Sequence, residues 1–140
     1  MVSLPGYLRT AVLALSLVLA PSLAEAENIP RKLTAEDAFA ILEMTLRGGS
    51  NYGGVDDATS PRSQPFFLFQ GIGRYSATIG WWAVNPWTGD MWTVWFCDDE
   101  KRLDSPFLLK ARAMFKRRFS QEELKQYERL RELKPGCLES

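Results

Sequence analysis

The chain has 140 residues, and 17 Lys and Arg balance 17 Asp and Glu, so its formal net charge is zero. This balance gives no general electrostatic attraction for nucleic acid or an anionic membrane. The sequence contains no histidine, which excludes Ser-His-Asp and Cys-His nucleophilic sites and the usual histidine-containing zinc sites.

Residues 1–26 have the pattern of a secretory signal peptide. Arg9 precedes the apolar run AVLALSLVLA, and the segment ends in AEA, a small-x-small cleavage pattern. At about ten residues the apolar run is too short to span a bilayer, which needs about twenty. We expect cleavage near Ala26, with an uncleaved membrane anchor as the alternative. Residues 27–140 are then a single α+β domain that is periplasmic or secreted.

The two cysteines, Cys97 and Cys137, are an even number in a chain expected to enter an oxidising compartment. That context predicts one disulfide, with two free thiols or a redox pair as the alternative. No C-x-x-C spacing supports redox chemistry.

A helix is predicted over residues 35–47. Thr34 can cap it, apolar residues recur at helical spacing through AFAILEMTL, and Gly48-Gly49 ends it. Residues 48–64 have no hydrophobic period and are rich in turn formers, which predicts a long loop. We interpret it as a surface loop. The alternative is a loop that contacts a partner, with Asn51, Tyr52 and Asp56 as candidate contacts.

Three strands are predicted over residues 65–72, 75–84 and 91–97, and the last two form a hairpin. The letters NPWTGD between them are typical of a turn, since Pro86 presets φ and Gly89 accepts a positive φ. We expect an antiparallel sheet of three to four strands that includes these three.

All five tryptophans lie in this hairpin. If Asn85 pairs with Asp90, Trp81 opposes Val94 and Ala83 opposes Trp92 on an apolar face that we expect to meet the helices. The other face carries Trp82 and Trp95 and is predicted to be semi-open, covered by the long loop or a C-terminal helix. Trp87 is predicted to lie exposed at the tip of the turn. These interpretations make Trp87, and then Trp82 and Trp95, candidate partner contacts.

Two helices are predicted after the sheet. Ser105-Pro106 begins the first, and the capping box SQEE at residues 120–123 begins the second. The basic stretch KARAMFKRRF at residues 110–119 is interpreted as a solvated helix face. An acidic partner or a membrane surface is the alternative. The resulting fold is α+β: a helix on a three- to four-stranded antiparallel sheet, then two helices.

Two carboxylate clusters remain as candidates for chemistry, Asp56-Asp57 and the DDE of residues 98–100. Adjacent carboxylates in polar loops are usually solvated, and DDE lacks the alternating spacing of a calcium loop. We therefore expect no catalytic residue, no metal site and no cofactor.

The hairpin AVNPWTGDMWTVW and the helix TAEDAFAILEMTL together resemble small secreted PepSY-like or cystatin-like domains. The matching hairpin positions run from Val84 to Asp90 in the form V-[DN]-P-x-T-G-[DE]. The resemblance implies binding or inhibition of a cell-envelope enzyme rather than catalysis. The long loop and the two further helices depart from this pattern.

Together these features predict a small exported protein, not an enzyme, that binds another protein or an envelope component and inhibits an envelope enzyme. The alternatives are a structural or accessory subunit of an envelope complex, and a small-ligand carrier that uses the Trp82/Trp95 face.

Overall fold

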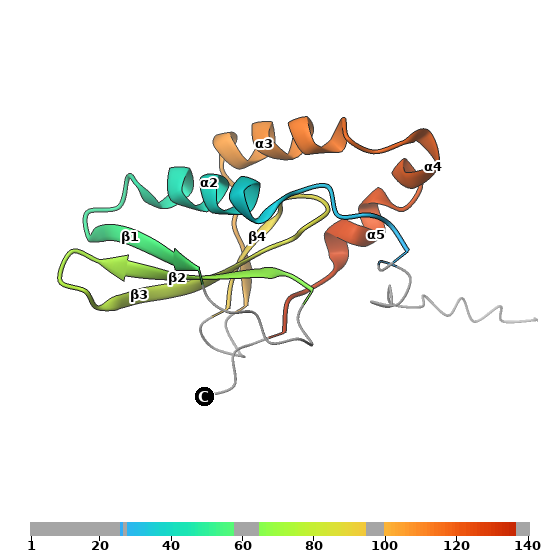
Figure 1. The fold of residues 1–140 in the computed structure, drawn as a ribbon. Coiled ribbons are helices and arrows are strands. Elements are labelled where there is room, and N and C mark those ends of the chain that lie inside the picture. Colours follow the sequence, from blue (N-terminus) through green and yellow to red (C-terminus); the bar gives the residue numbers. More distant parts are fainter. Residues whose placement is uncertain (1–25, 27, 58–64, 95–99, 137–140) are drawn as a thin grey trace, which may run out of the picture.

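The computed structural model describes residues 26, 28–57, 65–94 and 100–136. The predicted α+β class is confirmed: one antiparallel sheet lies between helices (Figure 1). Cys97 and Cys137 lie outside the described residues, as do Trp95 and most of the segment predicted to be a signal peptide. The disulfide therefore stays a prediction.

The sheet has five strands in the order β1-β2-β3-β4-β5. Their bounds are β1 Tyr52–Asp57, β2 Phe67–Gly73, β3 Thr78–Val84, β4 Met91–Thr93 and β5 Lys101–Arg102. The prediction of three to four strands is close but not exact. β1 arises from the Gly-rich segment predicted to be a loop, and the two-residue β5 adds a fifth strand. The backbone of β1 pairs with β2, for example Val55 with Gly71, so sheet pairing overrides weak local strand propensity.

The predicted register of the hairpin is confirmed. Trp82 pairs with Thr93, Ala83 with Trp92 and Val84 with Met91. The turn closes through a hydrogen bond from Asn85 N to Asp90 O of 2.8 Å. Gly89 has φ +77°, the positive value that the turn requires.

Helix α2, Ala35–Leu46, covers one face of the sheet. Thr34 and Asp37 form a capping box at its start, and Ala38, Ile41 and Leu42 are its buried residues. Helix α3, Pro106–Lys116, begins at the predicted Ser105 cap. Its buried residues form one hydrophobic core with those of α2 and the sheet. The sheet side chains of this core include Phe69, Trp82, Val84 and Met91.

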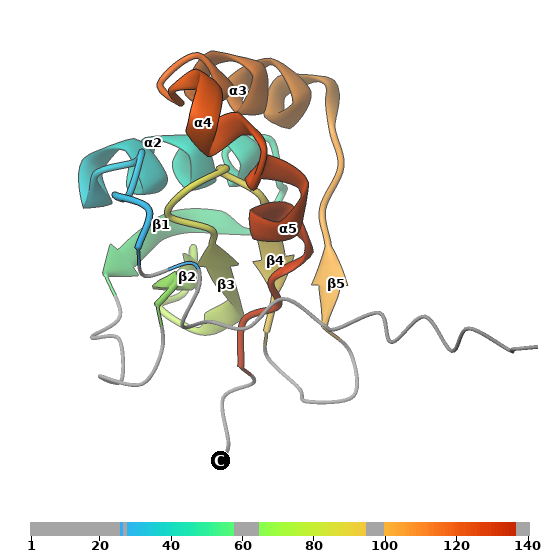
Figure 2. The ribbon, with the colours of Figure 1, turned by 90° about the vertical axis from the view of Figure 1, so that its right-hand side faces the viewer.

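Two shorter helices follow, α4 (Gln121–Leu124) and α5 (Tyr127–Glu132). The Ser120–Glu123 capping box is confirmed, but the predicted single helix is broken near Gln126. The described part therefore has three helices after the sheet instead of two. Figure 2 shows α5 beside β4, away from α2 and α3.

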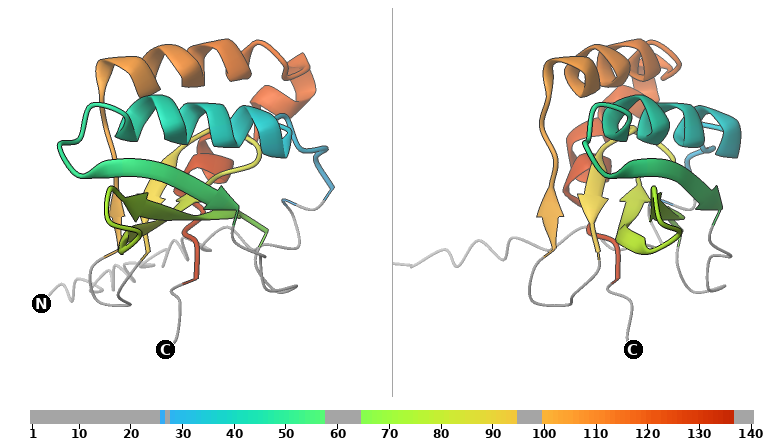
Figure 3. Two further views of the ribbon diagram at one scale, coloured as in Figure 1. Left: turned by 60° about the vertical axis from the view of Figure 1, so that its left-hand side comes forward. Right: turned by 90° about the vertical axis from the view of Figure 1, so that its left-hand side faces the viewer.

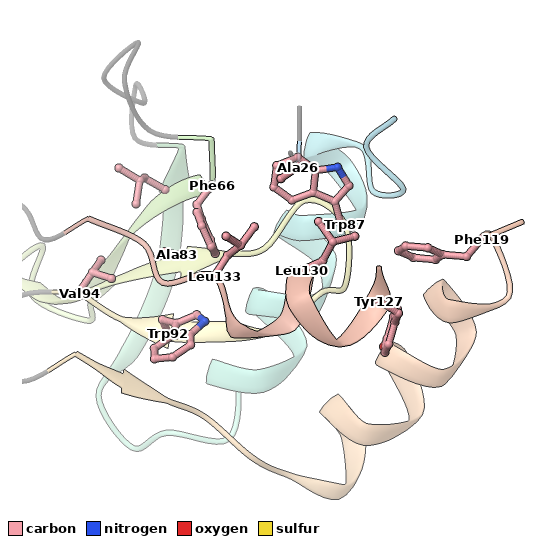
Figure 4. Close-up of a cluster of buried hydrophobic side chains, with 11 residues drawn as sticks. Ala26, Phe66, Ala83, Trp87, Trp92, Val94, Phe119, Tyr127, Leu130 and Leu133 are labelled. Carbon is pink, nitrogen blue, oxygen red and sulfur yellow. The ribbon is translucent and has the colours of Figure 1, made fainter. Parts of the chain in front are cut away.

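The α5 segment covers the second face of the sheet. Figure 4 shows its side chains converging with those of the strands. This second core contains Ala26, Phe66, Leu68, Ala83, Trp87, Trp92, Val94, Phe119, Tyr127, Leu130 and Leu133. Both faces of the hairpin are thus covered, whereas the sequence predicted one covered face and one semi-open face.

Among the described residues, no helix is long and apolar enough to cross a membrane.

Candidate protein-binding surface

The turn between β3 and β4 is buried, and other segments are anchored to it. Asn85 is 0% exposed. Its Nδ2 donates to Leu130 O at 2.7 Å, while its Oδ1 accepts from Trp87 N at 2.9 Å and Thr88 N at 3.1 Å. One side chain therefore shapes the turn and holds α5 against it.

Trp87, the strongest sequence candidate for a partner contact, is only 3% exposed. Its Nε1 donates to Ile29 O at 2.8 Å, and Pro86 O accepts from the backbone N of Lys32 and Leu33. The prediction of an exposed ring was wrong because residues 29–33 and α5 cover the turn. Both are distant in sequence, so the hairpin pattern could not reveal them.

Asp90 is a completely buried carboxylate, with 0% of its side chain exposed. Arg112 Nη1 donates to its Oδ1 at 2.5 Å, Thr88 Oγ1 to its Oδ2 at 2.7 Å, and Arg131 Nε to its Oδ2 at 3.3 Å. Arg112 also bonds Asp104 at 2.9 Å.

Burial alone would lower the pKa of Arg112, but its hydrogen bonds to Asp90 and Asp104 outweigh burial and raise that pKa. The cluster is therefore a charge-compensated core that ties α3 and α5 to the hairpin. Because Asp90 is sealed from solvent, its carboxylate has no access to a substrate.

Trp82 is buried, and it lies over two glycines. A Cβ added at Gly71 would come within 2.3 Å of its ring, and one at Gly80 within 2.6 Å. Trp82 also belongs to the same buried core as Ala38, Ile41 and Leu42 of α2. Trp82 therefore fills the core instead of lining a pocket, which corrects the predicted semi-open face. Trp81 is half-buried and Trp92 is 7% exposed, so Trp92 belongs to the core as predicted.

The most exposed large apolar side chain among the described residues is Tyr75, at 91%. It is the second residue of the four-residue loop 74–77 that joins β2 to β3. Gly73 N donates to Ala77 O at 2.7 Å and Ser76 N donates to Gly73 O at 3.0 Å. Ser76 has φ +61°, which is uncommon for a residue with a Cβ.

The loop is braced from the side by the chain entering β1. Arg74 N donates to Asn51 O at 3.2 Å, and Arg74, Tyr75 and Asn51 are all exposed. We call these three residues the Tyr75 end. It lies where the β2–β3 turn and the start of β1 meet, at the left of Figure 1.

The structure thus places one predicted contact, Asn51, at the Tyr75 end. Tyr52 is half-buried, and its hydroxyl donates to Glu43 at 3.4 Å. Burial, and then the Glu43 carboxylate, raise the pKa of Tyr52, which marks this side chain as a link between β1 and α2. Asp56 is exposed on β1, away from the turn.

The sequence reasoning missed Tyr75 because it placed residues 75–84 in one strand. The signal was present in GIGRYS, where two glycines and a serine surround an aromatic residue. Such a cluster favours a turn over a strand.

A small apolar cavity of about 250 Å³ opens beside the first turn of α2. It is lined by Ala35, Glu36, Phe39 and Phe69. Glu36 is its single ionisable group. Among the described residues, no group of three or more Asp, Glu, Cys or His side chains is placed to hold a metal ion.

No protein-family model and no curated protein matches this sequence. A similar solved structure is that of a type VI secretion system effector-immunity complex from Pseudomonas protegens. The likeness has a TM-score of 0.49 and 22% sequence identity, and covers 73% of this chain and 91% of that chain. A likeness of this degree transfers no property of that complex to this chain.

Proposed function

We propose that this chain is an exported, non-catalytic protein that binds a protein of the cell envelope through the Tyr75 end and inhibits it. The observation that carries the proposal is the 91% exposure of Tyr75 on a hydrogen-bonded turn. Export rests on the signal-peptide pattern of residues 1–26.

The chemistry of the Tyr75 end favours a protein partner. Tyrosine and arginine are enriched among the residues that dominate protein interfaces. Tyrosine also supplies a large contact area at a low cost in side-chain entropy. Since the loop is already braced by β1, little backbone entropy is lost when a partner binds. A projecting aromatic side chain of this kind suits insertion into the cleft of an enzyme.

The small-ligand carrier is the weaker proposal, because Trp82 lies over Gly71 and Gly80 in a buried core that includes residues of α2. The accessory-subunit alternative uses the same surface, and it differs only in what binding does to the partner.

The test is recovery of partners from an envelope extract by wild-type protein, Tyr75→Ala and Tyr75→Phe, followed by titration of each purified partner. Tyr75→Phe keeps the ring and should bind like the wild type. Tyr75→Ala should weaken binding by about thirtyfold, the effect of losing a dominant interface residue.

Equal affinity of Tyr75→Ala and wild type for every partner would remove the Tyr75 end from the interface. If the partner is an enzyme, adding the wild-type chain should lower its activity in proportion to the bound fraction. Full activity at saturation would favour the accessory subunit instead.

A further inference from the structure

Helices α2 and α3 lie side by side and antiparallel on the same face of the sheet (Figure 3). At one end an ion pair joins α2 to the turn that directly follows α3, Arg118 Nη1 to Asp37 Oδ2 at 2.8 Å. This pair identifies the flank of α2 that faces α3 and the flank of α3 that faces α2.

Three exposed apolar side chains follow from that end along the facing flanks. Met114 lies one helical turn before Arg118, and Phe107 lies about two turns before Met114. Met44 lies about two turns after Asp37 on α2. Their exposed fractions are 54% for Met114, 37% for Phe107 and 54% for Met44. We call these three residues the α2/α3 patch.

The α3 side of the patch is positively charged. Helix α3 contains no Asp or Glu. Lys110 and Arg117 are exposed, lie about two turns apart on one side of the helix, and form no ion pair with any residue that the structure describes. Arg112, from the same basic stretch, is instead buried against Asp90. Tertiary structure thus separates one structural cation from the exposed ones.

Exposed methionines are adaptable contacts for apolar side chains, and Phe107 adds aromatic area. Exposed apolar side chains rimmed by charge are typical of a docking site. The unpaired cations beside it determine the charge of the occupant, since an acidic surface would supply the carboxylates that α3 lacks.

We propose that the α2/α3 patch docks an acidic amphipathic segment of a partner protein. Apolar side chains of that segment pack on Met44, Phe107 and Met114, and its carboxylates pair with Lys110 and Arg117. An amphipathic helix that lays its apolar side on an exposed surface is a common form of such a segment. The surface is separate from the Tyr75 end and does not depend on the proposed function.

The geometry favours a protein over a membrane. Leu108, Ala111 and Phe115 form the buried side of α3, and Lys110 and Arg117 lie opposite them. The cations therefore extend furthest from the molecule, while the apolar patch lies on the flank toward α2. A helix that inserts into a bilayer presents its apolar side chains outermost.

The test selects displayed random peptides of about 16 residues, roughly four helical turns, on the full-length protein. Selected peptides should combine Asp or Glu with apolar residues at helical spacing. Their affinity should fall about tenfold or more in Lys110→Glu/Arg117→Glu, and also in Met44→Ser/Met114→Ser. The matched control is Lys101→Glu/Lys134→Glu, which reverses two exposed charges outside α2 and α3 and should bind like the wild type.

Charge exchange provides the decisive step. Peptides with Lys in place of their acidic residues should bind Lys110→Glu/Arg117→Glu and not the wild type, a rescue that general damage to the fold could not produce. Selection of no peptide, or equal affinity of the wild type and Lys110→Glu/Arg117→Glu, would overturn the proposal. So would binding only to phosphatidylcholine vesicles containing about one quarter phosphatidylglycerol, which would identify a membrane surface.

Discussion

Arg112 of α3 holds the completely buried Asp90 of the hairpin, with Nη1 and Oδ1 2.5 Å apart. The two residues lie 22 positions apart in sequence. Their contact joins α3 to the hairpin. Arg131 of α5 binds the other carboxylate oxygen of Asp90 at 3.3 Å, which joins α5 to the hairpin as well.

Removing Arg112 should therefore destabilise the fold strongly. We expect Arg112→Met to lower the free energy of unfolding by about 3–5 kcal/mol, because it leaves the Asp90 charge buried with less compensation. Asp90→Asn/Arg112→Met should lose less than the sum of the single changes. The measurement is urea denaturation. Arg117→Met, at an exposed position of the same helical segment, should change stability by less than about 0.5 kcal/mol; similar losses in both variants would contradict a structural role for Arg112.

Removing the Trp87 side chain should lower the stability of the fold strongly, whereas removing the Tyr75 side chain should not. Trp87→Ala opens a cavity in the core and removes the bond to Ile29, so we expect a loss of about 3–5 kcal/mol. Tyr75→Ala should change stability by less than about 0.5 kcal/mol, because the ring is almost fully exposed. Thermal and urea unfolding of both variants measure this difference. A stable Trp87→Ala protein would show that the turn is not anchored as described.

The contact between Gly71 and Trp82 predicts a steric effect. Gly71→Ala places a Cβ where the Trp82 ring lies, and we expect a loss of about 1–3 kcal/mol from overpacking. Gly54→Ala is the matched control in the neighbouring strand, since a Cβ there meets no atom within 4 Å. Its stability should equal or slightly exceed that of the wild type. Tryptophan fluorescence should shift in the first variant only.

Stability should fall in acid partly through Asp37. The hydrogen bond from Arg118 holds the pKa of Asp37 below its ordinary 3.8, against the opposing effect of burial. A lowered folded-state pKa means that the contribution of Asp37 is complete above about pH 4 and is lost as pH falls through the folded value. Urea midpoints between about pH 6 and pH 2 should therefore fall less for Asp37→Asn than for the wild type. An identical pH profile would show that this ion pair adds nothing to stability.

The disulfide remains to be tested chemically. If Cys97 and Cys137 pair, the non-reduced protein should weigh two hydrogens less than the reduced protein. Cys97→Ser/Cys137→Ser should then lose about 4 kcal/mol in the chain-entropy model. Labelling of two free thiols in protein purified from an oxidising compartment would rule the bond out.

The sequence alone determined the features that depend on near neighbours. Thr34, Ser105 and Ser120 cap helices where the local pattern predicted them, because a cap involves residues only two or three positions apart. Asn85 and Gly89 likewise set the turn, and the turn set the register of β3 with β4.

Only the tertiary structure decided which surfaces remain exposed. The tip of a hairpin is normally solvated, yet Trp87 is buried because residue 29 and α5 fold over it. Arg112 belongs to a basic stretch, yet it is buried because it pairs with the buried Asp90. Strand β1 forms because its backbone pairs with the edge of β2. Burial depends on contacts between distant segments, which local periodicity does not record. The exposed aromatic tip that the sequence assigned to Trp87 is therefore found at Tyr75.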